Sequence, residues 1–377
     1  MKECFLEITV TNKCSCHCKY CFEKTRPESS REEELRQVAL VKQFCDNFAS
    51  SGFDQLTLIF WGGEPLNNTR FLYELIETAI PYPFVKFRIY TNGHEKEAWQ
   101  DLMQQSWFAD ITRRLYVRIS YDGDPIHKML RGVESDNVMW LIDELRTRHV
   151  SFLHLMSTVS LEHVQYLEQS WDCFRHLRDK YEFAEFIPII DTTADMDDTL
   201  DEFKPILHRL VLKEFDYIMT RGKYSMPICI WFAKDEGTKP VRNCVSDYFV
   251  NMHTDGKFYF CYGCNSFPWA DKLALGDTKT VTDITQVAKK YDFGKINPEC
   301  AICDAIFCFT CQSANIPNPS SFDEFLSKWH KNRNARHRRC KYYKMIGRMN
   351  RLLWKAVDAK NRSILEDENE LAAVFGG

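Results

Sequence analysis

The sequence lacks the features of a secreted or membrane protein. No apolar signal segment precedes Cys14 in the N-terminal stretch MKECFLEITVTNKC, and no window approaches the roughly 18 apolar residues of a transmembrane helix. Strong charge is also missing, because a formal net charge of −4 over 377 residues is too small to steer the chain toward any partner. Repeats and low-complexity linkers are absent as well. These absences predict a cytoplasmic globular protein that does not associate with membranes.

Cysteine, by contrast, is abundant, with 16 residues. Without a secretory signal, this abundance indicates metal or redox chemistry rather than a disulfide framework. The clustered cysteines form two groups: Cys14, Cys16, Cys18 and Cys21, and then Cys244, Cys261, Cys264, Cys300, Cys303, Cys308, Cys311 and Cys340. The scattered ones, which we expect to be small buried hydrophobes, are Cys4, Cys45, Cys173 and Cys229.

Short apolar stretches alternate with helical patterns over about the first 210 residues. Strands are predicted at 5–10, 56–60, 85–90, 115–120, 152–158 and 183–190, and helices near 70–79, 94–107, 136–148 and 161–180. The first helix is predicted from the capping box Ser30-x-x-Glu33 and from apolar residues at helical spacing: Leu35, Val38, Val41, Cys45 and Phe48. Six β/α units predict an α/β fold with a parallel sheet, an incomplete (β/α)6 TIM-like barrel whose active-site residues lie at the strand C-terminal ends.

The character of the sequence changes past residue 240, where strand patterns become few and cysteines occur in turns. Metal crosslinks would stabilise such a region, because it has little apolar surface to bury. We therefore predict a barrel domain over residues 1–215, a bridging segment over 216–243, a small cysteine-rich domain over 244–345 and a C-terminal helix and tail over 346–377.

A basic, helical run from Lys328 to Lys355 carries interleaved aromatic residues, namely Trp329, Tyr342, Tyr343 and Trp354. Three interpretations stay open for this run: a solvated helix face, a contact with an acidic precursor peptide, or a nucleic-acid surface. The negative balance of the whole chain argues against nucleic acid.

The spacing Cys14-x3-Cys18-x2-Cys21 places three thiolates on one short loop after the first strand. Thiolates suit iron–sulfur clusters and zinc, but a structural zinc site needs four ligands. Three thiolates on a four-iron cluster leave one iron open for a ligand. Cys16 would be cramped as a fourth ligand, so we expect it to be a bystander; a zinc knuckle or redox thiols remain the alternative.

This loop, with the aromatic Tyr20 before its last cysteine, resembles the signature of the radical S-adenosylmethionine (SAM) superfamily. The resemblance implies that Tyr20 is a cofactor-binding residue. The end of the second strand, Gly62-Gly63-Glu64-Pro65, resembles the GGEP element of that family, which implies contacts with the amino group of SAM. Glycines permit close backbone approach, and a carboxylate stabilises an ammonium. The resemblance further implies contacts with the SAM carboxylate and ribose from residues that end the next two strands, which are Thr91, Asn92, Ser120 and Asp122; ordinary turn residues are also common there.

The second cysteine group resembles the SPASM extension of radical SAM enzymes that mature peptides and proteins. Cys244-x11-Gly256-x4-Cys261 is one element, and Cys300-x2-Cys303-x4-Cys308-x2-Cys311 followed by Cys340 is another, with its last two gaps each one residue shorter than usual. Two auxiliary [4Fe–4S] clusters are implied. The distal one would take Cys300, Cys303, Cys308 and Cys340. The proximal one would take Cys244, Cys261 and Cys311, with Cys264, the less well placed Cys229, or an open site in fourth position; two four-cysteine zinc sites are the alternative.

One carboxylate is a candidate for the chemical step. Asp235 lies in the stretch IWFAKDEG, and sulfatase maturases of this family carry a catalytic acid in a comparable stretch. An ordinary loop carboxylate is the competing interpretation.

The resemblance implies an enzyme in which a [4Fe–4S] cluster reductively cleaves SAM to a 5′-deoxyadenosyl radical, with electrons from a donor such as flavodoxin or ferredoxin. The radical takes hydrogen from a ribosomally made precursor peptide, giving a crosslink, oxidation or epimerisation. Many crosslinking relatives begin with a leader-binding domain, and this chain begins at strand one, so recognition of the precursor is expected from a separate leader-binding protein or from the SPASM region. The alternatives are sulfatase-maturase-like oxidation of a Cys or Ser in a protein and, remotely, a metal-stabilised nucleic-acid-binding protein, which would leave the GGEP element without a purpose.

Overall fold

The computed structural model describes residues 2–21, 27–124, 126–150, 152–159, 161–181, 185–190, 200–221, 249–259, 269–284 and 333–376, together with a few single residues between these ranges. No helix in these ranges is both long and apolar enough to cross a bilayer.

Six parallel strands form the first part of the fold. They are β1 (Glu3–Thr11), β2 (Gln55–Gly62), β3 (Val85–Thr91), β4 (Leu115–Ser120), β5 (Phe152–Val159) and β6 (Glu185–Ile190). Each pairs in parallel with its neighbour in the sequence, so the predicted strands and their parallel sheet are confirmed. The strands alternate with α1 (Arg31–Asp46), α2 (Thr69–Ala79), α3 (Lys96–Gln104), α4 (Phe108–Ile111), α5 (Ile126–Arg131), α6 (Asp136–Thr147), α7 (Leu167–Tyr181) and α8 (Leu200–Arg221). Short 3-10 turns lie at Phe48–Ser50, Pro65–Asn68, Thr112–Arg114, Leu161–Tyr166, Ala270–Leu273 and Arg362–Leu365.

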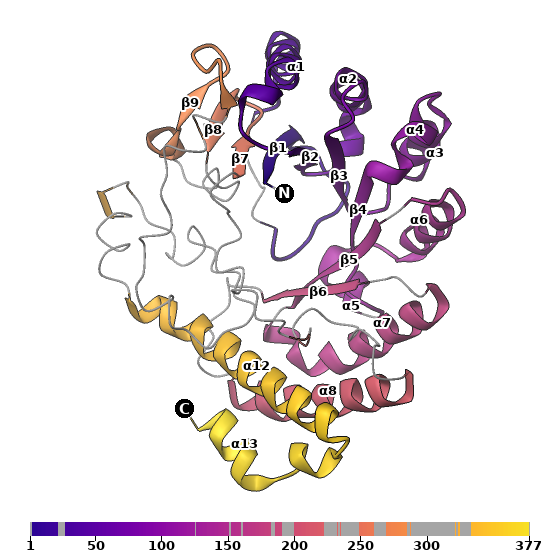
Figure 1. The fold of residues 1–377 in the computed structure, drawn as a ribbon, viewed down its shortest axis with the longest axis vertical. Coiled ribbons are helices and arrows are strands. Elements are labelled where there is room, and N and C mark those ends of the chain that lie inside the picture. The colour runs from indigo at the N-terminus through magenta and orange to yellow at the C-terminus, as the bar shows by residue number, and fades with distance from the viewer. Residues whose placement is uncertain are drawn as a thin grey trace.

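The helices cover one face of this curved sheet, as Figure 1 shows. Alternate strand residues such as Leu6, Phe87 and Val117 are fully buried against them, because successive side chains of a strand point to opposite faces. We call the other side the inner face of the sheet. The architecture is the predicted partial TIM-like barrel.

Three further strands extend the sheet beyond β1. The strand β7 (Phe249–Met252) pairs in parallel with β1, and β8 (Lys257–Tyr259) and β9 (Gly276–Asp277) follow in antiparallel pairing. The sheet order in the described part of the chain is thus β6-β5-β4-β3-β2-β1-β7-β8-β9. The first described strands of the cysteine-rich region therefore continue the barrel sheet.

The capping prediction for α1 is confirmed, because the Ser30 side chain accepts a hydrogen bond from the backbone N–H of Glu33. The predicted apolar face is partly wrong, since Leu35 is 49% exposed. Val41 and Cys45 of that face are buried as predicted, but the buried residues in the first two turns are polar. Gln37 is fully buried and donates to the carbonyl of His253, 3.0 Å away, so hydrogen bonds to the β7–β8 connection set the rotation of the helix.

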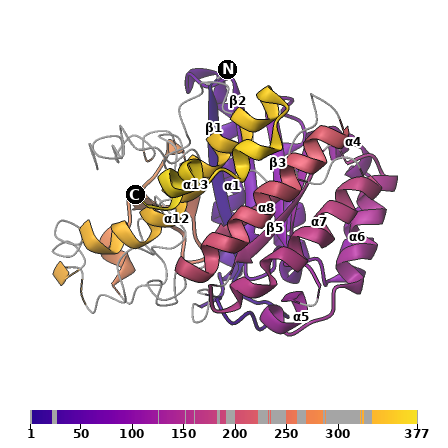
Figure 2. The same cartoon turned by 90° about the horizontal axis from the view of Figure 1, so that it is seen from below.

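The C-terminal helices are α12 (Arg333–Ala359) and α13 (Glu368–Phe375). Figure 2 shows α12 running beside α8. Tyr342 is buried against Phe203 of α8, with ring centroids 5.2 Å apart, and the indole of Trp354 donates to the carbonyl of Phe232. Tyr342, Tyr343 and Trp354 thus serve packing, while Lys341 and Lys355 remain on the exposed face. Trp329 lies outside the described residues.

Among the scattered cysteines, Cys4 and Cys45 are buried as predicted. Cys173 is only half-buried, and its thiol donates to the carbonyl of Asp124, so the expectation of a buried hydrophobe is wrong there. Cys229 lies outside the described residues.

Candidate active site

The cysteine loop after β1 is tied to the C-terminal end of α5 by backbone hydrogen bonds. The N–H of Lys19 donates to the carbonyl of Leu130 over 3.0 Å, and that of His17 donates to the carbonyl of Arg131 over 3.3 Å. Within the loop, the N–H of Cys21 donates to the carbonyl of Cys18. The loop is therefore positioned by its backbone, which leaves its thiols available as ligands.

The four cysteines of this loop are free thiols. Cys14 is exposed, and Cys16, Cys18 and Cys21 are half-buried. The Cys16 thiol hydrogen-bonds with both Cys14 and Cys18. These bonds lower the pKa of Cys14 to about 6 and that of Cys18 to about 7, and raise the pKa of Cys16. Cys16 thus lies between two predicted ligands, and its role as a bystander stays a prediction.

No three His, Cys, Asp or Glu side chains of the described residues converge on a point suited to one metal ion. The thiolates that hold a four-iron cluster each bind a different iron, so they do not need to converge in that way.

The two glycines of the GGEP element lie against the chain that leads into the cysteine loop. The N–H of Gly63 donates to the carbonyl of Thr11, and a Cβ at Gly63 would meet the carbonyl oxygen of Lys13 at 2.4 Å. Gly62 has a φ of +133°, and a Cβ there would meet the oxygen of Thr11 at 2.2 Å. Close backbone approach to the loop therefore requires both glycines. Their contacts with SAM stay a prediction.

Glu64, the next residue of the element, carries a buried carboxylate. It is fully buried and accepts hydrogen bonds from the Thr91 hydroxyl at 3.0 and 3.1 Å, the Asn92 N–H at 2.6 Å and the Leu66 N–H at 3.3 Å. Burial raises the pKa of Glu64 to about 8, and these hydrogen bonds oppose the rise. Pro65 begins the 3-10 turn that follows. A cation beside this carboxylate would restore its charge at neutral pH.

Asn92 connects Glu64 to the cysteine loop. Its side-chain amide lies 3.6 Å from the Cys14 sulfur and 3.4 Å from the Ser15 hydroxyl, while its backbone N–H binds Glu64. The predicted residues Glu64, Thr91, Asn92 and Cys14 are thus brought into one hydrogen-bonded network at the C-terminal ends of β1, β2 and β3.

Asp122 forms a second network beneath the loop. Its carboxylate pairs with the Arg131 guanidinium over 2.6 Å and accepts hydrogen bonds from the Tyr20 hydroxyl and the Thr158 N–H. Arg131 also lies 3.9 Å from the Cys18 sulfur. Asp122 and Tyr20, both predicted as cofactor-binding residues, are therefore joined to each other and to the cysteine loop. Ser120 ends β4 on the inner face and is half-buried.

Three residues that the sequence did not predict also lie beside these networks. Arg131 is buried on the short helix α5, and nothing in its sequence context marks it. His94 and His127 lie with their Nε2 atoms 3.1 Å apart, and burial lowers the pKa of His94 to about 4 and that of His127 to about 3, with the Arg131 charge acting in the same direction. Only the fold brings the two histidines together.

Several predicted site residues lie outside the described residues: Asp235, Cys244, Cys261, Cys264, Cys300, Cys303, Cys308 and Cys311. Cys340 lies in α12.

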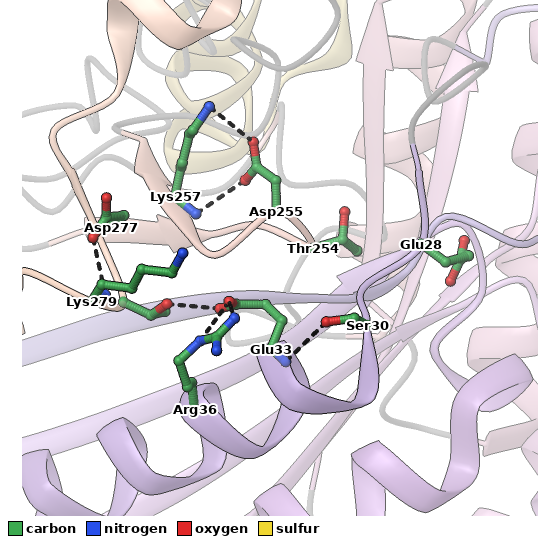
Figure 3. A pocket seen from close by; sticks show the side chains of 10 residues that line it. Glu28, Ser30, Glu33, Arg36, Thr254, Asp255, Lys257, Asp277 and Lys279 are labelled. Atoms are coloured by element: carbon green, nitrogen blue, oxygen red, sulfur yellow. Dashed lines mark hydrogen bonds and ion pairs between the residues drawn. The ribbon is translucent and has the colours of Figure 1, made fainter.

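A polar pocket of about 320 Å³ lies between the N-terminal turn of α1 and the connections around β8 and β9 (Figure 3). Its wall is made by Glu28, Ser30, Glu33, Arg36, Thr254, Asp255, Lys257, Asp277, Thr278 and Lys279. Glu33 lies at its centre, paired with Arg36 and accepting from the Thr278 hydroxyl. A Cβ on Gly256 would meet the Glu33 carboxylate at 2.2 Å, and Gly256 has a φ of +75°, which explains a glycine at this position of the cysteine-rich region. The pocket's charges are largely satisfied within the protein.

Comparison with known proteins identifies the domain that carries the cysteine loop and the GGEP element. Residues 8–181 match the family model of the radical SAM superfamily. These residues form a radical SAM domain. The protein is accordingly a radical SAM enzyme.

Solved structures share the fold of the radical SAM domain and of most of the remaining chain. The native structure of anSMEcpe, a sulfatase maturase, with bound AdoMet has a TM-score of 0.59 and 18% identity, covering 89% of this chain and 99% of that chain. SuiB from Streptococcus suis bound to S-adenosylmethionine has a TM-score of 0.53 and 14% identity, covering 85% of this chain and 76% of that chain. No curated protein sequence matches the chain. At identities this low, the structural matches establish the fold alone.

The residues of the radical SAM domain fit the two cofactors that the family implies, a [4Fe–4S] cluster and SAM. Among the thiols of the loop, Cys14 lies beside the Asn92 amide and Cys18 beside the Arg131 guanidinium, and both donors suit the sulfur of a cluster. Glu95 Oε1 is buried without a hydrogen-bond partner among the described residues, and its negative charge acts on Cys14. A buried carboxylate oxygen without a partner among the described residues, close enough to Cys14 for its charge to act on that thiol, suits SAM, whose sulfonium and ammonium groups are cationic.

Proposed function

We propose that the protein is a radical SAM maturase that modifies a ribosomally made precursor peptide. The network that joins Cys14 to the buried carboxylate of Glu64 through Asn92 carries this proposal, because it puts a cluster ligand and a cation-binding group side by side. The peptide substrate is supported by structures with the same fold, which include anSMEcpe with AdoMet and a peptide named Cp18Cys, and SuiB with the precursor peptide SuiA.

Each residue of this network then has a defined task. Cys14, Cys18 and Cys21 hold the cluster, and Glu64 and Glu95 hold the cationic groups of SAM. When bound, the cluster and SAM supply a 5′-deoxyadenosyl radical that takes a hydrogen atom from the substrate. The inner face of the sheet orients the peptide and excludes water, so that one hydrogen lies within reach.

The second cysteine group supplies the remaining part of the proposal. We assign two auxiliary [4Fe–4S] clusters to it, with the ligand sets implied by the SPASM resemblance, and Asp235 as the acid that takes a proton from the substrate. In this proposal, an external reductant such as flavodoxin or ferredoxin supplies the electrons. A separate leader-binding protein recognises the precursor peptide.

A second candidate is oxidation of a Cys or Ser in a protein substrate, as in sulfatase maturation. One observation favours it: the match covers 99% of the anSMEcpe chain and only 76% of the SuiB chain, so the overall organisation follows the sulfatase maturase more fully. Mass spectrometry separates the two candidates, because oxidation of one Cys or Ser alters a single residue, whereas a crosslink joins two.

The test is anaerobic reconstitution followed by metal analysis and SAM turnover. About twelve irons per chain are expected if three four-iron clusters are present, and dithionite should drive formation of 5′-deoxyadenosine. Replacing Cys14, Cys18 and Cys21 with Ala should abolish that product and remove about four irons, whereas Cys45→Ala, the matched change at a buried cysteine away from the loop, should affect neither. Zinc in place of iron, or product that survives the triple replacement, would refute the proposal.

A further inference from the structure

Arginine side chains lie on the inner face of the sheet, below the strand ends that carry the active site. Arg88 of β3 and Arg118 of β4 alternate along their strands with the fully buried residues Phe87, Ile89 and Val117, which pack against the helices. Both arginines are therefore directed to the inner face and are half-buried there.

The strand register groups these arginines with aromatic side chains. Tyr90 and Arg118 are register partners, and so are Arg88 and Tyr116. The Arg118 guanidinium donates to the Tyr90 hydroxyl over 2.8 Å and lies 5.2 Å from the centre of that ring. Arg88 lies 5.6 Å from the ring of Tyr116 and reaches across β2 to within 6.0 Å of the ring of Phe5 on β1. Both guanidinium groups thus lie against aromatic rings, Arg88 against two and Arg118 against one.

Neither arginine is neutralised by the protein in the part of the chain that the structure describes. No ion pair joins Arg88 or Arg118 to a carboxylate among the described side chains, and the Nε of each is buried without a hydrogen-bond partner. Half-buried guanidinium groups are normally paired with carboxylate or phosphate, because their desolvation is costly. The guanidinium N–H groups that have no partner among the described residues, including both Nε–H groups, are therefore available to bind an anion.

Two acidic side chains that the structure describes on the β1 side of the same face have other partners. Glu3 accepts hydrogen bonds from Gln55 and Thr57 of β2, at 2.6 and 2.5 Å, and Glu7 accepts one from Asn251 of β7 at 3.1 Å. Each of these carboxylates is thus engaged at the β1 side of the sheet. Among the described side chains, the charges that the inner face carries at β3 and β4 are therefore positive.

The neighbouring histidine responds to this unneutralised charge. His154 of β5 is the register partner of Arg118. Burial is the main cause that lowers the pKa of His154 to about 4, and the positive charges of Arg118 and Arg88 lower it further. An anion bound between the arginines would remove part of that repulsion.

We propose that Arg88 and Arg118 form a carboxylate-binding subsite for the substrate, so that the modified peptide carries a carboxylate close to the residue that reacts. This inference rests on the proposed peptide substrate. Arg118 lies two residues before the C-terminal end of β4, so a carboxylate there is roughly 7 Å below the strand ends, within the reach of a short peptide. The carboxylate comes from an Asp or Glu side chain or from the C-terminus of the peptide, and both sources present the same two oxygens to the guanidinium donors.

The test uses the reconstituted full-length protein and three pools of fluorescein-labelled octapeptides, whose other positions are random among uncharged residues. The first pool has one fixed Asp and an amidated C-terminus, the second has Asn in its place, and the third has Asn with a free C-terminal carboxylate. Fluorescence anisotropy should show at least about tenfold tighter binding of the first or third pool than of the second, the size expected for a charge-assisted hydrogen-bonded pair. The pool that binds more tightly identifies the source of the carboxylate.

Arg88→Gln and Arg118→Gln should each remove most of this preference. Arg113→Gln is the matched control, because it removes the same charge from an exposed residue outside the inner face and should leave the preference intact. Arg118→Lys, which keeps the charge but loses the planar fork, should retain a reduced preference and serves if the Gln variant does not fold. Equal binding of all pools by the unaltered protein, or a preference that persists in both Gln variants, overturns the subsite.

Dithionite-driven formation of 5′-deoxyadenosine by the unaltered protein is measured in the same preparations. Product formation without discrimination between the pools refutes the carboxylate subsite and leaves the maturase proposal standing. Absence of product refutes the maturase proposal, whatever the binding results.

Discussion

Arg131 is the residue on which the cysteine loop depends most directly. It is buried, it neutralises the buried Asp122, and it reaches the sulfur of Cys18, while its backbone carbonyl accepts from the loop. One residue therefore holds the loop by its backbone and supplies positive charge beside a thiolate. A buried ion pair of this kind is costly to break, because the remaining partner stays charged and desolvated.

We predict that Arg131→Gln lowers the free energy of unfolding by about 3–5 kcal/mol, because it leaves Asp122 uncompensated. Urea denaturation followed by circular dichroism measures the change. Adding Asp122→Asn to the Arg131→Gln protein should recover part of the loss, since no buried charge then remains. Strict additivity of the two replacements would contradict this account.

The pair formed by His94 and His127 predicts a pH dependence of stability. Both pKa values are lowered in the folded protein, to about 4 and about 3, from 6.5 in the unfolded chain. The unfolded chain therefore binds more protons below about pH 6.5, so the contribution of the pair is fully present above that pH and is lost as the pH falls toward 4.

Thermal unfolding at pH 7.5, 6.0 and 5.0 tests this prediction. The melting temperature of the unaltered protein should fall more steeply with acidity than that of a His94→Gln, His127→Gln double variant. The comparison cancels the contribution of the carboxylates, which is common to both proteins. Parallel curves would rule out neutral histidines at this position.

At the scale of elements, the junction between the end of β2 and the start of the cysteine loop decides whether the site forms. The β1–β2 register shifts at this point, between Thr9 and Thr11, and Gly62 pairs with Thr11. The two glycines then follow the loop backbone closely enough for Gly63 and Glu64 to donate to its carbonyls. The GGEP element is therefore a packing surface for the loop as well as the source of a carboxylate.

We predict that Gly63→Ala lowers stability by about 1–3 kcal/mol and reduces the iron bound per chain, because the new methyl group would displace Lys13 from its contact with the turn. Gly52→Ala is the control, since a Cβ there meets nothing within 4 Å and its φ of +79° adds only local strain. Iron content of the reconstituted proteins distinguishes the two. Full iron loading of Gly63→Ala would disprove the proposed role of the junction.

At the scale of the whole molecule, α12 joins the C-terminal end of the chain to the barrel through α8. The apolar face of α12 is buried where its side chains are described, over residues 341–359, and Met349 and Leu353 are fully buried. Figure 1 shows both helices at the same end of the fold, beyond the last barrel strand. The C-terminal helix is thus part of the barrel's hydrophobic core.

We predict that Leu353→Ala lowers the free energy of unfolding by about 2–5 kcal/mol, which is the usual cost of a cavity in a packed core. Lys341→Ala, on the exposed face of the same helix, should change it by less than about 0.5 kcal/mol. Equilibrium urea unfolding measures both. Similar values for the two variants would show that α12 is not packed as described.

The sequence by itself determined where the strands lie and which residues end them. The six predicted barrel strands agree with β1 to β6 to within two residues at each end, because alternating burial and apolar stretches are local properties of the chain. Cys14, Glu64, Thr91 and Asn92 could likewise be predicted, since parallel strands bring their C-terminal ends to one edge. The rotation of α1 about its axis could not be predicted. Leu35 is exposed rather than buried, because the helix instead buries Gln37, whose burial depends on a hydrogen bond to the distant His253.

Only the tertiary structure decided which charges meet. Arg131 with Asp122, His94 with His127, and Arg88 beside Arg118 are pairs made by strand register and by a helix packed on the next strand end. No local pattern encodes such contacts, because the pKa of a buried group and the partner of a buried ion depend on the groups around it in space. The cysteines and the GGEP element therefore predict the chemistry, whereas the fold alone shows the charged inner face that we expect to select the substrate.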